Sequence, residues 1–560
     1  MLMLATMLLL FVAACGFNDD DEQDASTDES NTEAEAPEAD EDEEEEEESE
    51  GTDGAASGVV NLQTSAEIPT ADSSHAHDSA GFTTLNNTNE GLYRSDENHI
   101  PQLAIAEEHE TNDDETVHTF TIRDAEWANG EPVTAHDFEY AWKRTFEVAG
   151  HYSDMFVTAN VKNAQAVLDE EMSPDELGVE ALDEQTLEVT LEGPSPLFKN
   201  LLTFPTFFPL NEEFVEEHGE SFGTEADKVL ENGPYILDSW HHDQGWTFKK
   251  NDNYWDADNV QMEEINMEIV KETSTAVNLW ETGELDYITL SSSYVDEYEN
   301  DESFYIDEQA SIVFMRVNHN MEEFQNENIR KAIDMSLDKD GLTDVILNDG
   351  SVPLNSLIPY KFSYSPDEEK DFRDINGDFN EGSKEEAQEL WEQGLDEVGI
   401  DGFEVSLTAS DAEAHEKAAE YVKDQLETNL EGLTVEIDKV PFEARLEKEK
   451  AVEYDMVIST WGPDFNDPMT FLDMWITGGS ANRMDFSDED YDNIIDEARD
   501  EVDELKRYDL LLEAENMLMD EMHIIPLFQD ADAILKRTNI KNMIRHPSAP
   551  QYDYKLMSVE

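Results

Sequence analysis

Short segments in which apolar and polar residues alternate are a recurring feature of this 560-residue chain. Residues 117–123 place Phe120 and Ile122 on one face, and residues 186–191 and 245–250 alternate in the same way. A period of two predicts a β-strand with one buried face. Further strands are predicted where short apolar runs occur, at residues 59–62, 403–407, 434–439 and 456–460.

Other segments have apolar residues three and four positions apart, which predicts helices that bury one face. In residues 135–146, Phe138 and Trp142 share a face, and the preceding Thr134 is a typical N-cap residue. Further helices are predicted at residues 275–282, 327–337, 384–397, 413–430 and 487–503. Because strands and helices mix along the chain, we predict an α/β (mixed α+β) fold.

The first 57 residues follow neither pattern. Residues 1–14 are apolar and end in two alanines before Cys15, the only cysteine. This run is shorter than the about 20 residues that span a bilayer, and small residues precede a signal-peptidase site, so we predict a secretory signal. Residues 17–57 are mostly acidic or small and contain the block 43–48 of glutamates, which predicts a solvated, extended tether.

The charge of the chain restricts its partners. There are 137 acidic against 33 basic side chains, a formal net charge of -104, which excludes binding to nucleic acid. The excess continues beyond the tether and predicts a halophilic setting, since salt near 1 M shortens the Debye length to about 3 Å. With one cysteine, disulfides and thiolate metal sites are excluded. The length suffices for two or three lobes.

Motifs for catalysis are missing from the sequence. There is no glycine-rich phosphate loop, no Gly-x-Ser-x-Gly elbow and no His-Glu-x-x-His. Histidine pairs at His75/His77 and His241/His242 lie in polar segments without evident third and fourth ligands, so we predict no metal site and no cofactor.

Four segments carry the positive evidence. They are GLYR at 91–94 with residues 119–144, NGPY at 232–235 with NDNYW at 251–255, RVNHN at 316–320 with residues 329–339, and WGPD at 461–464 with residues 465–472. In this order they resemble the oligopeptide- and dipeptide-binding family of extracellular solute-binding proteins of ABC importers. Val12-Ala-Ala-Cys15 resembles the lipobox of bacterial lipoproteins, whose cysteine carries a membrane anchor.

The resemblance implies a periplasmic-binding-protein-like fold of two lobes that close on the ligand like a flytrap, with an extra domain inserted in the first lobe. The crossover strands would lie near 308–318 and 530–536. The implied division is a signal peptide at 1–14, lipidated Cys15 and the acidic tether at 15–56, lobe I at 57–89, 212–314 and 531–560, the inserted domain at 90–211, and lobe II at 315–530.

The resemblance also implies a ligand site. Family members bind an extended peptide between the lobes and pair with its backbone, which leaves specificity broad. The residues carried over are Asp464 for the ligand's α-ammonium, Trp461 and Gly462 beside the first ligand residue, Tyr152 near the ligand backbone and His415 for its carboxylate end. Where some members carry an arginine this chain has Ile458. The alternatives are a local turn at Asp464, a core tryptophan, a loop tyrosine and a solvated histidine.

The implied function is that of a lipid-anchored receptor on the extracellular face of the cell membrane. It would capture oligopeptides and deliver them to the membrane subunits of an ABC importer, without catalysis and as a monomer. Alternatives are the same fold with another solute (nickel chelate, haem, sugar or a signal peptide), a secreted hydrolase acting through paired carboxylates, and a surface adhesion protein.

Overall fold

The computed structural model describes residues 58–366 and 370–560. All described residues belong to the second of two units of the chain, Gly54–Glu560. The predicted signal peptide, Cys15 and the acidic tether lie outside the described residues. Within the described part, no helix is both long enough and apolar enough to cross a membrane.

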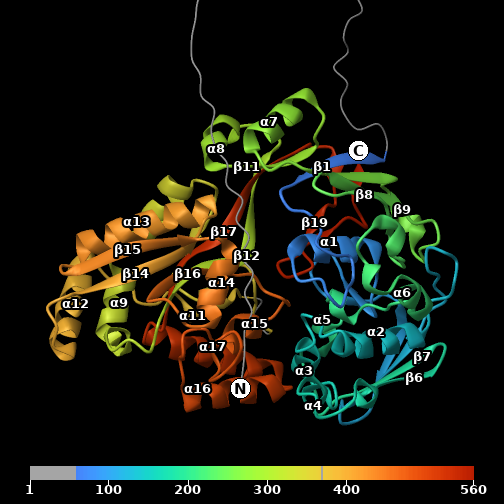
Figure 1. Cartoon of the computed structure of the whole chain (residues 1–560), viewed down its shortest axis with the longest axis horizontal. Helices are drawn as coiled ribbons and strands as arrows, with labels where there is room; N and C mark the ends of the chain where they lie inside the picture. Colours follow the sequence, from blue (N-terminus) through green and yellow to red (C-terminus); the bar gives the residue numbers. More distant parts are fainter. Residues whose placement is uncertain (1–57, 367–369) are drawn as a thin grey trace, which may run out of the picture. The chain divides into compact units, whose positions relative to one another are not determined.

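An eleven-stranded sheet runs through the second unit (Figure 1). The strands lie in the order β15 (Leu433–Val440), β14 (Phe403–Ser410), β16 (Met456–Trp461), β12 (Phe304–Val317), β17 (Ile524–Lys536), β11 (Tyr287–Leu290), β1 (Val59–Thr64), β10 (Glu264–Ile269), β9 (Gly245–Lys250) and β8 (Tyr235–His241), with β13 (Val352–Pro353) paired to β17.

The two longest strands, β12 and β17, connect the two halves of this sheet (Figure 1). They pair with each other in antiparallel fashion from Phe304 to Arg316 of β12. The end of β12 also pairs with β16, whereas the end of β17 pairs with β11. Since a strand is a stiff element, this arrangement fixes the loop that follows β16 relative to β12.

A separate four-stranded antiparallel sheet has the order β4 (Ala106–Thr111), β5 (Val117–Ile122), β7 (Thr186–Thr190) and β6 (Val179–Asp183). Helix α2 (Ala135–Glu147) packs on β6 and β7. Thr134 begins α2 as predicted, because its N–H and hydroxyl donate to the Asp137 carboxylate over 2.7 and 3.0 Å. Phe138 and Trp142 are fully buried on one face of this helix.

The remaining α-helices are α1 (Ser79–Thr88), α3 (Met155–Thr158), α4 (Ala164–Leu168), α5 (Phe198–Leu201), α6 (Glu212–His218), α7 (Thr273–Thr282), α8 (Ser292–Tyr298), α9 (Glu327–Met335), α10 (Lys339–Gly341), α11 (Phe372–Asn376), α12 (Lys384–Val398), α13 (Glu413–Asn429), α14 (Phe442–Lys450), α15 (Met469–Leu472), α16 (Glu489–Asp500) and α17 (Glu504–Asp520), besides 3-10 and π turns. Some of these helices lie beside the main sheet, and others, such as α3 and α4, lie near α2 (Figure 1). The mixed α/β fold class is as predicted.

One predicted helix was too long. The helix predicted at residues 487–503 ends at Asp500, and the chain then begins the separate helix α17. Asp503 is the N-cap of α17, since its side chain accepts the N–H of Lys506 over 3.1 Å. An aspartate near the end of an apolar pattern therefore marked the start of the next helix.

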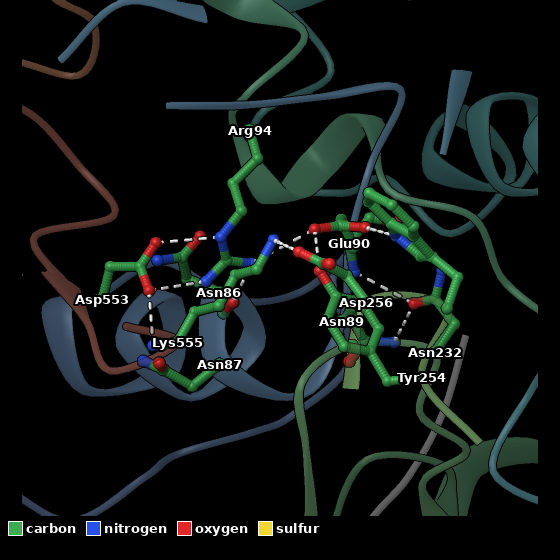
Figure 2. Close-up of polar contacts among 12 residues, drawn as sticks. Asn86, Asn87, Asn89, Glu90, Arg94, Asn232, Tyr254, Asp256, Asp553 and Lys555 are labelled. Carbon is green, nitrogen blue, oxygen red and sulfur yellow. Dashed lines mark hydrogen bonds and ion pairs between the residues drawn. The ribbon is translucent and has the colours of Figure 1, made fainter. Parts of the chain in front are cut away.

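The early sequence motifs meet in a buried polar network (Figure 2). Glu90 accepts hydrogen bonds from the Tyr254 hydroxyl and the Trp255 indole, each over 2.5 Å. Its backbone exchanges two bonds with the Asn232 amide, over 3.0 and 2.9 Å. The segments at 91–94, 232–235 and 251–255 are thus joined around one buried carboxylate, a structural role for these motifs.

The same network holds the C-terminal segment (Figure 2). Arg94 donates from Nε to Asp553 over 2.9 Å and from Nη1 to the Asn86 carbonyl over 2.8 Å. Burial opposes the charge on Asp553, but Arg94 outweighs it and holds the pKa of this carboxyl below its usual range. The Asn87 amide bonds the backbone on both sides of Asp553, which fixes the chain end against α1.

Candidate functional site

The loop after β16 is held by hydrogen bonds to residues of α15 and α17. The Trp461 indole donates to the Thr470 carbonyl over 3.0 Å, and the Asp464 N–H donates to the Thr470 hydroxyl over 3.1 Å. Arg507 of α17 binds both carboxylate oxygens of Asp467, over 2.6 and 2.8 Å. Asp467 also accepts the Met469 N–H at the start of α15. The local turn is therefore stabilised by Asp467. The side chain of Asp464 is left for another use.

The Asp464 carboxylate meets Tyr152, which comes from the segment between α2 and α3. The two groups lie close enough for each to shift the pKa of the other. The Tyr152 ring packs against Phe82 and Phe204, with ring centroids 5.4 and 4.8 Å apart. This packing aims the hydroxyl, and burial together with Asp464 raises the pKa of Tyr152 above its usual value.

Asp464 lies in an environment that disfavours its charge. Burial raises its pKa to about 7, and the nearby Asp473 and Asp154 also raise it, whereas the Tyr152 hydroxyl lowers it. Burial likewise raises the pKa of Asp473 to about 7. Among the described residues no lysine or arginine forms an ion pair with Asp464. A cation that entered this site would therefore be attracted by the Asp464 carboxylate, which has no ion-pair partner among the described residues.

The ring of His415 lies between two hydroxyl groups. Its Nδ1 lies 2.6 Å from the Ser410 hydroxyl and its Nε2 lies 2.9 Å from the Thr460 hydroxyl. Burial lowers its pKa to about 4, with Arg445 as a further cause. The imidazole is thus neutral near pH 7 and ties α13 to β14 and β16, next to Trp461.

Three further residues lie in the same region of the sequence or next to the residues described above. Gly462 is exposed, and a Cβ there would lie 2.9 Å from the Ser311 hydroxyl on β12, so a larger residue would collide with that strand. Ile458 is fully buried in the main hydrophobic core. Lys450 is exposed and pairs with Glu447 over 3.0 Å.

Two adjoining cavities lie at one part of the main sheet. The larger of this pair, about 410 Å³, opens at the ends of β1 and β11, and the smaller one of about 150 Å³ lies beside it. They share Leu290, Ser291 and Asp532. The larger cavity is lined by the aromatic residues Trp246, Tyr287, Tyr552 and Tyr554 and by Met267 and Met543. The smaller one includes Ala414 and Lys417 of α13.

These cavities and the Asp464 loop are linked through α13. Ala414 lines the smaller cavity, and the next residue, His415, bonds Thr460 beside Trp461. Asp464, Trp461, Tyr152 and Gly462 do not line either cavity. The aromatic lining was missed in the sequence because its members come from distant segments, and the alternation of Tyr552 and Tyr554 is the one local signal.

Possible metal ligands do not form a metal-binding cluster in the described part of the chain. Among residues 58–366 and 370–560 no group of three or more His, Cys, Asp or Glu side chains could hold a metal ion. His77 and His151 lie close, with ring centroids 4.6 Å apart, but further ligands are missing from the described residues.

The chain is similar to known proteins in both sequence and fold. The family described as bacterial extracellular solute-binding proteins, family 5 Middle, matches residues 101–483. The dipeptide-binding protein DppE of Bacillus subtilis is 35% identical over 83% of this chain and 85% of its own. The oligopeptide-binding protein OppA of the same organism is 30% identical over 84% of this chain and 87% of its own. The solved structure of Listeria monocytogenes OppA bound to peptide is 40% identical, with a TM-score of 0.78 over 90% of this chain and 99% of that one.

Proposed function

Since the chain belongs to the bacterial extracellular solute-binding proteins of family 5, we propose that it captures oligopeptides and delivers them to an ABC importer. The family resemblance inferred from the four motifs is confirmed, and so is the binding-protein fold class. Members of this family bind solutes for ABC importers, and the chain is accordingly a binding protein and not an enzyme.

The observation that carries the proposal is the Asp464 carboxylate, which meets Tyr152 and has no basic partner among the described residues. An α-ammonium group placed against it would supply the missing positive charge. A charge-assisted bond of this kind contributes roughly 1.5–3 kcal/mol net. The chemistry of the site and the peptide-binding relatives both support peptide capture.

The remaining parts of the proposal concern the ends of the chain and the lobes. Cys15 would carry the lipid anchor, and residues 15–56 would hold the body away from the extracellular face of the membrane. Lobe I (57–89, 212–314 and 531–560), its inserted domain (90–211) and lobe II (315–530) would close around the peptide. Closure would allow the permease to distinguish the loaded protein from the empty one, as a ligand that prefers one state shifts the population.

A different solute within the same fold is the second candidate. A sugar, a haem or a nickel chelate would leave the Asp464 carboxylate without a positive partner. A signal peptide with a free N-terminus would satisfy it as well as a nutrient peptide does. The charge at Asp464 therefore favours an amine-bearing ligand over these other solutes.

The test is calorimetric titration of the purified protein in molar salt with a mixed pool of short peptides, and then with the same pool N-acetylated. We expect binding that acetylation abolishes. The variant Asp464→Asn should bind the free pool at least tenfold more weakly, whereas Asp488→Asn, at an exposed helix cap, should bind like the parent protein. Absence of binding to both pools would refute the peptide assignment.

A further inference from the structure

Three arginines, two of them buried, surround a single buried glutamate in the predicted second lobe. Arg445 of α14 donates to Glu449 one turn along the same helix. The Arg316 Nε lies 3.9 Å and the Arg483 Nη1 lies 3.7 Å from the Glu449 Oε2. The last two distances are ion-pair contacts too long for a hydrogen bond. Within the described residues, Glu449 is the one carboxylate that is ion-paired with any of these arginines.

The charges in this arginine cluster do not balance. Arginine stays protonated in proteins, so three positive charges face one negative charge. The side chains of Arg316, Arg445 and Glu449 are at most 3% exposed, and that of Arg483 is 22% exposed. Nearby Tyr454 donates its hydroxyl to the Arg483 carbonyl, and Asp485 is exposed and bound to Asn320. Buried charge of this kind is costly unless a counter-charge accompanies it.

The hydrogen-bond donors of the cluster are also incompletely used. The Nε atoms of Arg316, Arg445 and Arg483 are enclosed and have no acceptor among the described residues. Arg316 directs Nη1 to the Ala481 carbonyl over 2.9 Å, and its guanidinium lies 4.8 Å from the Trp475 ring. Three unused donors beside an excess of positive charge are what an anion requires.

Two hydroxyl groups flank the same place. Strand register sets Thr408 and Arg316 on either side of Val457, and Ser459 lies two residues further on the same face of β16. The hydroxyls of Thr408 and Ser459 are both buried and have no partner in the described part of the chain. α14, which carries Arg445 and Glu449, packs over β14 at this face. Hydroxyl donors therefore add to the arginine donors.

We propose that Arg316, Arg445 and Arg483, together with the Thr408 and Ser459 hydroxyls, form a binding site for a small inorganic anion such as chloride. The site is independent of the proposed peptide function. Its enclosure favours a single ion over the carboxylate of a peptide, which would bring its chain with it. Burial lowers the pKa of Arg316 to about 10 and that of Arg445 from its ordinary value, and a bound anion would oppose this effect. The ion would enter and leave beside Arg483, which is partly exposed.

The first test compares thermal unfolding in sodium chloride, sodium bromide and sodium gluconate at equal sodium concentration, so that ionic strength stays the same. A halide that binds only the folded protein raises its melting temperature as its concentration rises. We expect chloride and bromide to raise the melting temperature above its value in gluconate. Equal melting temperatures in all three salts would overturn the proposal.

Single substitutions test whether the halide-dependent rise in melting temperature arises at this cluster, and whether each change increases or reduces it. Arg483→Gln, at the most exposed member, should reduce the halide-dependent rise, and Glu449→Gln should increase it, because the cluster then has a larger positive excess. Arg499→Gln removes a partly exposed arginine from the surface pair with Asp496 and should leave the rise unchanged. A halide effect equal in all three variants would place the ion elsewhere and refute the assignment.

Diffraction separates the two possible sources of the anion. Crystals grown in bromide should give an anomalous peak within hydrogen-bonding distance of the Arg445 Nε.

A peptide and its C-terminal amide should bind with the same dependence on chloride. If chloride weakens only the peptide with a free carboxylate, the cluster is a subsite for the ligand and the inorganic site is refuted.

Discussion

The Tyr152 hydroxyl and the Asp464 carboxylate lie close enough for each to shift the pKa of the other, although one follows α2 and the other follows β16. Packing against Phe204 holds the first side chain, and the loop fixed by Thr470 holds the second. This contact joins the predicted inserted domain to the predicted second lobe. A ligand ammonium placed here would contact groups from both, which makes this pair the most informative place to test the proposed function.

The pH dependence of peptide binding follows from Asp464. Its pKa is raised to about 7 by burial, so the ligand-free carboxyl is largely protonated below pH 6 and must ionise to bind an ammonium group. We expect affinity to increase about tenfold per pH unit below pH 7, with proton release on binding, and to fall above about pH 8, where the α-ammonium group of the ligand loses its own proton. Calorimetry in buffers of different ionisation enthalpy measures that release.

Stability should change with pH in the opposite direction. A carboxyl whose pKa is raised on folding stabilises the ligand-free protein below its unfolded value near 4, and this contribution is lost as pH rises to about 7. Asp473, with its pKa also raised to about 7, adds to this effect. The rise in melting temperature caused by peptide should therefore grow from pH 5 to pH 8. A rise that is constant over this range would contradict the role of Asp464.

Tyr152→Phe should weaken peptide binding while keeping the ring packed. Loss of the hydroxyl beside the carboxylate should cost no more than one hydrogen bond, about 0.5–1.5 kcal/mol, or roughly a threefold to tenfold loss of affinity. Because the Tyr152 hydroxyl lowers the pKa of Asp464, the pH midpoint of binding should also move upward. Titrations at several pH values measure both effects. Tyr298→Phe, which removes an exposed hydroxyl bound to Glu281 over 3.0 Å, should change neither.

Arg507→Gln should loosen the Asp464 loop from a distance. The change leaves Asp467 without its bidentate partner, and breaking a buried pair costs about 3–5 kcal/mol. We expect a lower free energy of unfolding and weaker peptide binding. Adding Asp467→Asn should restore part of the stability, since the uncompensated charge is then removed. If Arg507→Gln binds peptide as tightly as the parent protein, α17 has no part in positioning the loop.

Arg94→Ala should release the C-terminal segment. Its guanidinium binds Asp553 and the Asn86 carbonyl in a buried network, so we expect a loss of about 3–5 kcal/mol in urea unfolding at molar salt. Residues 540–560 should become sensitive to protease. Lys249→Ala, which removes a surface pair with Asp238 over 2.8 Å, should cost about 0–1 kcal/mol. Equal losses in the two variants would contradict a special role for the network.

Local structure was largely predictable from the sequence. Residues 245–250 form β9 with the predicted bounds, and α2 begins after the predicted cap at Thr134. These elements depend on contacts between residues a few positions apart, which periodicity and capping report directly. The division between α16 and α17 was missed because an apolar pattern continues across it.

The surroundings of the site residues were predictable only in part. The sequence pointed to Asp464, but its lack of a basic partner depends on which side chains surround it. His415 was assigned to a ligand carboxylate, whereas its ring bonds Ser410 and Thr460 and is neutral near pH 7, so that assignment stays a prediction. The partners of a side chain that lie far away in the sequence leave no periodic signal near it.

The sequence by itself determined the fold class, the family and the position of Asp464 in its loop, because these depend on patterns and motifs read along one chain. Tertiary structure alone decided that Tyr152 meets Asp464, that Glu90 joins three motifs, and that Arg316, Arg445 and Arg483 share one carboxylate. Those relationships depend on pairings such as β12 with β16, and the distance between two side chains across a sheet is set by register and packing and not by spacing along the chain.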